Sequence, residues 1–437
     1  MFYQLTKSRH VPQIPVPGLY TRRLLLTFLF IYLVLIFVAR YTSSRDPTSV
    51  FFQPSKGYEP IYSTLRTTQA AKYIQDTENN EHGPWEWRSS PTPSICIGVA
   101  TVARKNARYF KTMVGSLIEG LSEAERADMH LILFIAHTDP SVHPAYAEPW
   151  LQRVADQVLL YDEATVNISH IHNLETGEER LSAREKALFD YTYLLRACEG
   201  VGAEHVAMLE DDVLAMDGWY HRTRQALASI KQQMAEKREP KWLYLRLFYT
   251  ERFLGWNAEE WPTYLFYSLF AVTSITSILL LTRHYLPKTR PFLQNDTIFA
   301  LCAFCTPALI ILFFAAGRVT MLPIPTGVNE MAKFGCCSQG FVFPQSRVSD
   351  LVALYEKERV GYVDMLTERY ANEHDETRWA VTPSVMQHVG RLSSKEALNQ
   401  GGQKSSVAEL WNFGFELNEA GALRQEHDIV NVAVSGG

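Results

Sequence analysis

Residues 205–219 read His-Val-Ala-Met-Leu-Glu-Asp-Asp-Val-Leu-Ala-Met-Asp-Gly-Trp, so three consecutive carboxylates, Glu210, Asp211 and Asp212, follow a short apolar run. The run predicts a buried β-strand, and a glycine-containing turn signal comes a few residues later. Three adjacent acidic side chains repel one another unless a positive charge lies among them, and a divalent cation commonly supplies it. Ligands of α/β sheets bind where strands end. The stretch therefore predicts a metal site on an α/β sheet, and the alternatives are an acidic turn or a helix cap.

The composition is that of a globular protein. The chain has 437 residues, of which 47% are hydrophobic and 20% charged, which predicts two or three domains or one large domain with additions. Its net charge of -5 and the lack of a basic stripe with interleaved aromatic residues give no reason to expect nucleic acid as a partner. Six cysteines in so long a chain do not indicate a disulfide scaffold.

The N-terminus predicts a membrane anchor. Residues 1–23 contain four Lys and Arg residues and no Asp or Glu, and residues 24–40 are apolar up to a closing Arg40. The sequence before Arg40 lacks the small residues of a cleavage site, so the anchor is predicted to stay uncleaved. The positive-inside rule puts the leader in the cytosol and the chain after Tyr41 in the lumen. Residues 41–93, rich in Ser, Thr, Pro and Gln, are expected to form a stem that is at best partly ordered.

Globular patterning begins at Ser94. Alternating strand and helix patterns predict βαβ units and a parallel sheet. The expected strands are Ser94–Ala100, His130–Ala136, Gln157–Tyr161, Trp242–Tyr249 and Phe341–Phe343, besides the acidic strand, and the expected helices are Tyr109–Leu121, Ser182–Cys198 and Val348–Tyr370.

Two further stretches, Trp261–Thr282 and Ile298–Gly317, are nearly uncharged and long enough to span a membrane. A basic loop separates them, so a membrane hairpin with a cytosolic loop is expected, and a pair of buried helices is the alternative. The predicted domains are residues 94–260 and 318–394 as two halves of one lumenal domain, residues 261–317 as the hairpin, and residues 395–437 as a loosely packed tail.

The cysteines fit this topology only partly. Cys302 and Cys305 fall in the third predicted span, where they would serve as packing residues. The other four are predicted to be lumenal, where disulfides persist, but the sequence does not pair them. These four are Cys96, Cys198, Cys336 and Cys337.

The chain resembles the GT-A glycosyltransferases, and more closely the family of Golgi enzymes that add an N-acetylgalactosamine branch to glycosylphosphatidylinositol (GPI) anchors. In that family a GT-A domain is split by a tandem transmembrane insertion behind an N-terminal anchor. More distantly, it resembles the N-acetylglucosaminyltransferases that start N-glycan branches, which lack the hairpin. The resemblance rests on residues 98–104, 134–139, 184–191, 210–212 and 383–390, in that order.

The resemblance implies a Rossmann-like mixed sheet and a nucleotide-sugar site. Asp212 is expected to bind Mn²⁺ (or Mg²⁺), with Glu210 on the same strand face, and the resemblance adds His388, which would otherwise be taken for a core histidine. Asp211 is expected to reach the donor's ribose. Residues expected to bind the rest of the UDP-sugar donor are Thr101, Val102, Arg104, Asp139, Arg184, Lys186 and Asp190, although the last two could equally form an ordinary ion pair on the surface of one helix.

The family reaction inverts the anomeric carbon, so one general base is needed. Asp364 is expected to fill this role, with Glu330 as second choice, although Asp364 could equally be a solvent-facing helix residue. The predicted function is metal-dependent transfer of N-acetylgalactosamine from UDP-GalNAc to a mannose of membrane-embedded GPI anchors, in the Golgi lumen. The alternatives are an N-glycan-branching enzyme and a noncatalytic membrane scaffold.

Overall fold

The computed structural model describes residues 18–79, 89–104, 108–177, 179–237, 241–331, 337–390 and 410–435. The chain forms two compact units, and each takes two separate stretches of sequence. We call Met1–Gly57 with Leu254–Pro323 the helical unit, and Tyr58–Phe253 with Ile324–Gly437 the sheet unit.

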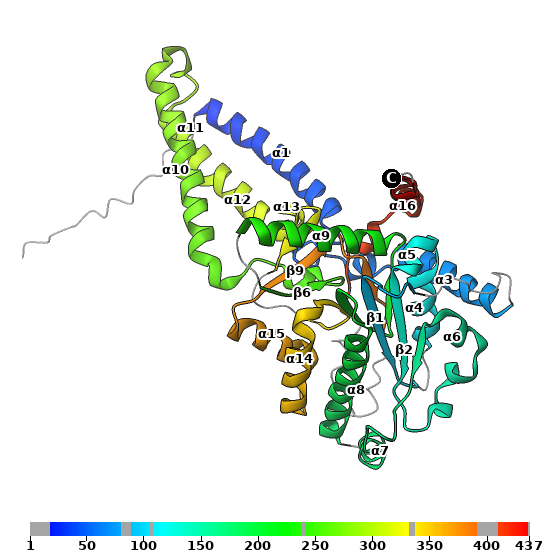
Figure 1. The fold of residues 1–437 in the computed structure, drawn as a ribbon. Helices are drawn as coiled ribbons and strands as arrows, with labels where there is room; N and C mark the ends of the chain where they lie inside the picture. Colours follow the sequence, from blue (N-terminus) through cyan, green and yellow to red (C-terminus); the bar gives the residue numbers. More distant parts are fainter. Residues whose placement is uncertain are drawn as a thin grey trace, which may run out of the picture. The chain divides into compact units, whose positions relative to one another are not determined.

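The helical unit contains three segments that are long and apolar enough to cross a membrane (Figure 1). None of the residues of its longest helix is buried, and an apolar surface of that kind suits lipid better than water. Within the unit, the Thr21 hydroxyl donates to Asp296 at 2.8 Å and the Tyr32 hydroxyl to the Ala308 carbonyl at 3.0 Å. The helices are α1 (Leu19–Thr42), α2 (Pro54–Gly57), α10 (Trp261–Tyr285), α11 (Asn295–Ala300), a π-helical turn (Leu301–Cys305), α12 (Thr306–Ala315) and α13 (Arg318–Met321). The anchor and both hairpin helices are therefore confirmed as apolar helices of spanning length, and Cys302 and Cys305 lie free in the third.

The sheet unit is built on one mixed sheet of eight strands in the order β3-β2-β1-β4-β8-β6-β9-β7, with a separate pair β10-β5. Strands β1, β2, β3 and β4 are parallel, and β8 runs antiparallel to both β4 and β6. The strands are β1 (Ile95–Thr101), β2 (Met129–Ile135), β3 (Gln157–Leu159), β4 (His205–Glu210), β5 (Val213–Ala215), β6 (Trp242–Arg246), β7 (Gly327–Glu330), β8 (Gly340–Pro344), β9 (Thr377–Thr382) and β10 (Met386–His388). Every predicted strand is confirmed.

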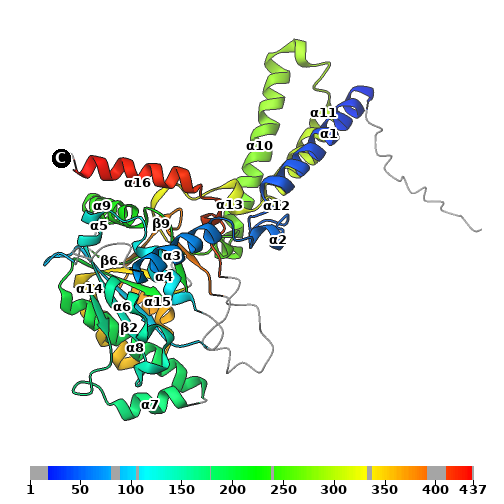
Figure 2. The ribbon, with the colours of Figure 1, turned by 90° about the vertical axis from the view of Figure 1, so that its right-hand side faces the viewer.

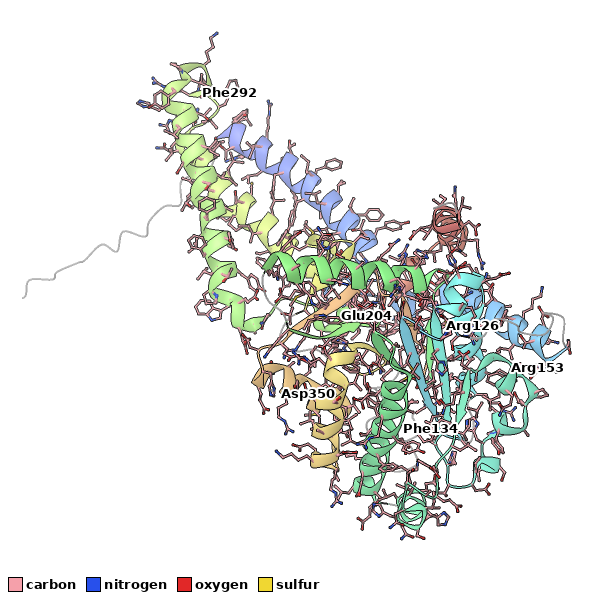
Figure 3. All side chains as sticks on the ribbon, in the orientation of Figure 1. Arg126, Phe134, Arg153, Glu204, Phe292 and Asp350 are labelled. Atoms are coloured by element: carbon pink, nitrogen blue, oxygen red, sulfur yellow. A yellow bond between two sulfur atoms is a disulfide. The ribbon has the colours of Figure 1, made fainter. Side chains whose placement is uncertain are left out.

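Helices cover both faces of the sheet, because its central strands are apolar on both sides. One face packs on α3, α4 and α9, and the other on α8, α14 and α15 (Figure 1). Phe134, labelled in Figure 3, lies in this second core, and its ring is 5.4 Å from that of Tyr193 on α8. The helices are α3 (Tyr62–Glu78), α4 (Tyr109–Ile118), α5 (Glu123–Ala127), α6 (Pro149–Val154), α7 (Ile168–Thr176), α8 (Arg180–Val201), α9 (Trp219–Lys237), α14 (Gln345–Glu358), α15 (Val363–Glu373) and α16 (Ala420–Ser435).

A disulfide joins Cys96 on β1 to Cys198 on α8, and Cys337 is disulfide-bonded too. Cys336 lies outside the described residues.

Two expectations about order and one about the length of a helix were wrong. The stem contains α3, whose Ile74 side chain lies in the hydrophobic core. Arg66 on the same helix is fully buried as well, where it pairs with Glu119 and donates to the Ala215 and Ser116 carbonyls. The tail contains α16 and a buried segment around Phe415. The helix predicted over Val348–Tyr370 is two helices, since Arg359 adopts a positive φ of 62° and ends the first.

Candidate active site

The carboxylate cluster forms where β1 and β4 end, because the two strands are parallel and in register. Ala100 pairs with Glu210, so Thr101 lies beside the start of the acidic triplet. Two turn residues then lead into β5, which returns the chain to the same region. The acidic triplet is therefore brought next to the segment that follows β1.

Asp211 is buried and accepts hydrogen bonds from two predicted donor-site residues. The Thr101 hydroxyl donates to Oδ2 at 2.7 Å, and the Arg104 guanidinium donates to Oδ1 at 2.6 Å. Burial raises the pKa of Asp211 to about 6, although the Arg104 charge opposes that rise. Behind Thr101, His143 Nε2 lies 3.1 Å from the hydroxyl, and Nδ1 of the same ring accepts from the Ala145 N–H. His143 therefore donates through Nε2, and it fixes the direction of the Thr101 hydroxyl.

Asp212 meets His388, the histidine that the sequence places far along the chain. His388 Nε2 lies 3.7 Å from Asp212 Oδ2, because Val213 and His388 pair directly in the β5–β10 ladder. The Val389 N–H also donates to the Asp212 carbonyl at 2.9 Å. Burial would lower the pKa of His388, but its neighbour Asp212 raises it, and the pairing lowers the pKa of Asp212 despite that group's own burial.

The pair fits a divalent cation. Asp212 Oδ1 is buried without a hydrogen-bond partner among the described residues, so one carboxylate oxygen is free for a ligand. His388 Nδ1 lies 2.9 Å from the Leu410 carbonyl, which accepts a hydrogen bond from the Nδ1–H. Nε2, facing Asp212, then has its lone pair available for a metal. Gly390 keeps the space open, since a Cβ there would lie 2.3 Å from Asp212 Oδ2 and 2.9 Å from His388 Nε2. A carboxylate is a donor that suits manganese and magnesium, and an imidazole is a common ligand of divalent transition metals.

Glu210 and Asp364 are linked by one short loop. The Ser338 hydroxyl donates to Glu210 Oε1 at 2.6 Å, and the neighbouring Cys337 N–H donates to Asp364 Oδ2 at 3.3 Å. Arg246, fully buried on β6, donates to the Cys337 carbonyl at 2.9 Å and so holds the loop in place. Asp364, half-buried in the first turn of α15, is therefore connected to Glu210 through this loop.

Lys186 and Asp190 form a buried pair and not the surface pair that was the alternative. Lys186 Nζ lies 2.8 Å from Asp190 Oδ2 and donates to the Ala136 carbonyl and to the Tyr161 hydroxyl. The carbonyl belongs to the residue just after β2, so the pair fixes the end of that strand. Glu175 lies 3.6 Å from Lys186 and accepts from the Thr138 N–H.

Four further predicted residues lie away from the cluster or on its border. Val102 is half-buried against the α8 side of the sheet, and Arg184 stacks over the Tyr362 ring at 4.4 Å, beside the start of α15. Asp139 is exposed and caps its own turn by accepting from Ser141. Glu330 is on the edge strand β7, four strands from β4, where Lys237 donates to it at 2.9 Å. The structure does not bring Glu330 to the carboxylates.

Sequence reasoning missed several residues that shape the cluster. His143 and Ser338 each bond a predicted site residue, and His137 Nε2 accepts from the Ala103 N–H at 2.8 Å. Tyr191 is also new. Burial raises its pKa well above the ordinary value, the nearby Glu210 adds to that rise, and its hydroxyl has no hydrogen-bond partner among the described residues. None of them stands in a spacing that indicates chemistry, so only the fold could reveal them.

Known proteins of similar sequence are glycosyltransferases by name. An alpha-1,6-mannosyl-glycoprotein 4-beta-N-acetylglucosaminyltransferase of Gallus gallus is 26% identical over 152 residues, which cover 32% of each chain. An alpha-1,3-mannosyl-glycoprotein 4-beta-N-acetylglucosaminyltransferase C of Danio rerio is 24% identical over 168 residues, which cover 35% of this chain and 34% of the relative. The type B enzyme of Danio rerio is 28% identical over 140 residues, which cover 29% of this chain and 25% of the relative. The match thus spans about a third or less of these relatives.

The family model described as GPI-N-acetylgalactosamine transferase PGAP4 matches residues 95–387, from the start of β1 to within one residue of His388. That range takes in the carboxylate cluster, both hairpin helices and every strand of the large sheet. Since it is more than half of the chain, the protein belongs to the GPI-N-acetylgalactosamine transferase PGAP4 family.

Proposed function

We propose that the protein transfers N-acetylgalactosamine from UDP-GalNAc to a mannose of membrane-embedded GPI anchors. The observation that carries this proposal is the meeting of Asp212 and His388 at 3.7 Å, beside the acidic end of β4, in a chain that belongs to this family. We assign the sheet unit to the GT-A class, with its active site in the Golgi lumen.

Asp212 and His388 would hold Mn²⁺ or Mg²⁺, with Glu210 as a further ligand from the same strand. Such an ion supplies positive charge that neutralises the diphosphate as it leaves the sugar. The Arg104 guanidinium, 12% exposed beside Asp211 and Asp212, adds a positive charge that the chain itself provides. Arg104 is therefore placed to contact a phosphate, while Asp211, itself bonded by Thr101, holds it in position.

Asp364 would act as the general base that takes the proton of the acceptor hydroxyl. Backbone N–H groups of Cys337 and Met365 donate to its two oxygens at 3.3 and 2.9 Å, so the carboxylate has a fixed direction. Arg184 supports the same turn by stacking on Tyr362. Glu330 is ion-paired with Lys237 at the edge of the sheet, so we propose Asp364 and not Glu330 as the general base.

The helical unit suits an acceptor that is itself held in a bilayer. The chain leaves the sheet unit after β6, forms two apolar helices, and returns before β7. A tether alone would need only α1, so the pair of apolar helices inserted in the sheet unit suits an enzyme whose acceptor is held by a lipid. Transfer to soluble glycans should not require that pair.

An assay of purified full-length protein with UDP-GalNAc tests the proposal. We expect transfer to GPI-anchored acceptors that stops with chelator and resumes with Mn²⁺, and we expect Asp212→Asn to lose nearly all turnover. Glu185→Gln, at a half-buried position on α8, is the matched carboxylate control and should keep activity. An Asp212→Asn protein that is fully active would refute the assignment of Asp212 as a metal ligand, and a wild-type protein that transfers no sugar would refute the proposed function.

The relatives named above favour a second acceptor, the mannose of N-linked glycans. Both acceptors should therefore be offered to one preparation with UDP-GalNAc and with UDP-N-acetylglucosamine. Transfer to the N-glycan alone would replace the GPI proposal and leave the assignment of Asp212, His388 and Asp364 in place.

A further inference from the structure

A second cluster of metal-binding side chains lies in the sheet unit, apart from the carboxylates at the end of β4. Glu125 on α5, His221 on α9 and His427 on α16 each offer a ligand atom, and these atoms all lie within 4.8 Å of one another. His221 is 6% exposed and His427 is 1% exposed. Figure 2 shows α16 beside α9 and α5, so the cluster lies where the last helix joins the rest of the unit.

The orientation of His427 is the one that a metal-binding histidine needs. Its Nδ1 lies 3.0 Å from Asp217 Oδ1, so this nitrogen carries the proton that the carboxylate accepts. Its Nε2 lies 2.8 Å from Glu125 Oε2. A carboxylate behind one ring nitrogen, with the other directed at the metal, is the usual support for a histidine ligand. Arg424 holds Asp217 in turn, at 2.6 Å.

His221 completes the cluster from the first turn of α9. Its Nε2 lies 3.3 Å from Glu426 Oε1, and its ring centroid is 5.1 Å from that of His427. Gly218 makes room for this ring, because a Cβ there would lie 2.5 Å from His221 Cε1. Arg222 donates to both oxygens of Glu426 and keeps that carboxylate at the cluster's border.

Not every polar atom of the cluster is engaged in a hydrogen bond among the described residues. Glu125 Oε2 already accepts from the N–H and the hydroxyl of Ser122 in the cap of α5. The second oxygen of Glu125, Oε1, and Nδ1 of His221 are both buried without a hydrogen-bond partner among the described residues. Buried polar atoms without a partner are rare and commonly mark an ion or a ligand.

We propose that Glu125, His221 and His427 bind a structural Zn²⁺ ion, with Glu426 at the fourth position. Two imidazoles and two carboxylates suit zinc, which prefers four ligands in structural sites. Without metal, a proton on His427 Nε2 can bridge to Glu125, and zinc takes the place of that proton and releases it. The ion ties the C-terminal helix to α5 and α9.

Zinc analysis of the purified full-length protein tests this site. After exposure to micromolar Zn²⁺ and removal of the excess, we expect one zinc per chain that an excess of Mg²⁺ does not displace. Co²⁺ in its place should give the strong visible absorption of a tetrahedral site. His221→Ala should lose the bound zinc, and Asp217→Asn should weaken zinc binding about 10- to 100-fold.

Two controls separate this site from the proposed active site. His170→Ala removes an exposed histidine on α7 and should leave zinc binding unchanged. Asp212→Asn should also keep the zinc, because that residue belongs to the other cluster. If His427→Ala fails to fold, the zinc content of His221→Ala still tests the site. A folded wild-type protein that takes up no zinc, or a His221→Ala protein that binds it as well as wild type, overturns the proposal.

Discussion

Gly390→Ala is the sharpest test of the site formed by Asp212 and His388, because it adds one methyl group and removes no ligand. The new Cβ would lie 2.3 Å from Asp212 Oδ2 and 2.9 Å from His388 Nε2, whereas ordinary contacts begin at 3.4 Å. One side chain must therefore move by roughly 1 Å. The Gly390 φ is not in the left-handed region, so the substitution acts through space and not through backbone strain.

A displacement of about 1 Å at a reacting centre can cost on the order of 100-fold in rate. That factor corresponds to about 2.7 kcal/mol of lost transition-state stabilisation. We expect kcat/KM for transfer from UDP-GalNAc to fall by this amount. Binding of Mn²⁺, followed by electron paramagnetic resonance, should weaken in parallel. The unfolding midpoint should be measured on the same variant, so that a loss of activity can be separated from a loss of folded protein.

Gly200→Ala is the matched control. A Cβ at this position near the end of α8 meets no atom within 4 Å, so activity and Mn²⁺ binding should be those of the wild type. Alanine is the better helix former by up to about 1 kcal/mol, so this variant should be slightly more stable. If Gly390→Ala keeps wild-type kcat/KM and Mn²⁺ affinity, the space between Asp212 and His388 is not where the metal binds.

Three further predictions concern the frame around the site. Lys186→Met leaves Asp190 buried without its cation and should destabilise the protein by about 3–5 kcal/mol in denaturant unfolding, whereas Lys186→Met with Asp190→Asn should recover much of the loss. Reducing Cys96–Cys198, which are 102 residues apart, should cost about 2–5 kcal/mol, and an unchanged midpoint would contradict this. Burial would raise the pKa of Glu175, but hydrogen bonds from neighbouring His and Thr side chains and the Lys186 charge lower it to about 2. The resulting stabilisation is complete above pH 4.5 and lost as pH falls through 2, so Glu175→Gln should be less stable than wild type at pH 6, and the difference should vanish towards pH 2.

The local pattern of apolar residues was sufficient to predict the strands that position the carboxylates. The apolar run before Glu210 is β4, and the runs at residues 94–100 and 130–136 are β1 and β2, because buried parallel strands are apolar on both faces. The three apolar helices are equally plain, since membrane-spanning length and lack of charge need no tertiary context. Asp211, Thr101 and Arg104 converge because parallel register brings the ends of β1 and β4 together.

The sequence could not predict which distant segments of the chain pair with each other. β5 and β10 are three residues each, too short for a periodic signal, yet their ladder is what brings His388 to Asp212. Residue by residue, His388 looks like a core histidine, and only the resemblance to a family suggested otherwise. The same holds for α3 and α16, whose polar composition suggested a stem and a tail, although each has one side packed on the sheet unit. Arg66 shows why, because its buried charge is paired with Glu119 and hydrogen-bonded to carbonyls that sequence alone cannot locate.

The place where the helical unit is inserted matters for how the site is assembled. β8 lies between β4 and β6, yet it follows residues 254–323 in the chain, so the sheet cannot close until the chain has returned from the helical unit. The returning segment also brings β10 with His388 and the loop that bonds Glu210 and Asp364. The carboxylates therefore come from one side of the insertion, and the histidine and the proposed base from the other. The active site is therefore complete only when the two stretches of the sheet unit, before and after the insertion, have paired with each other.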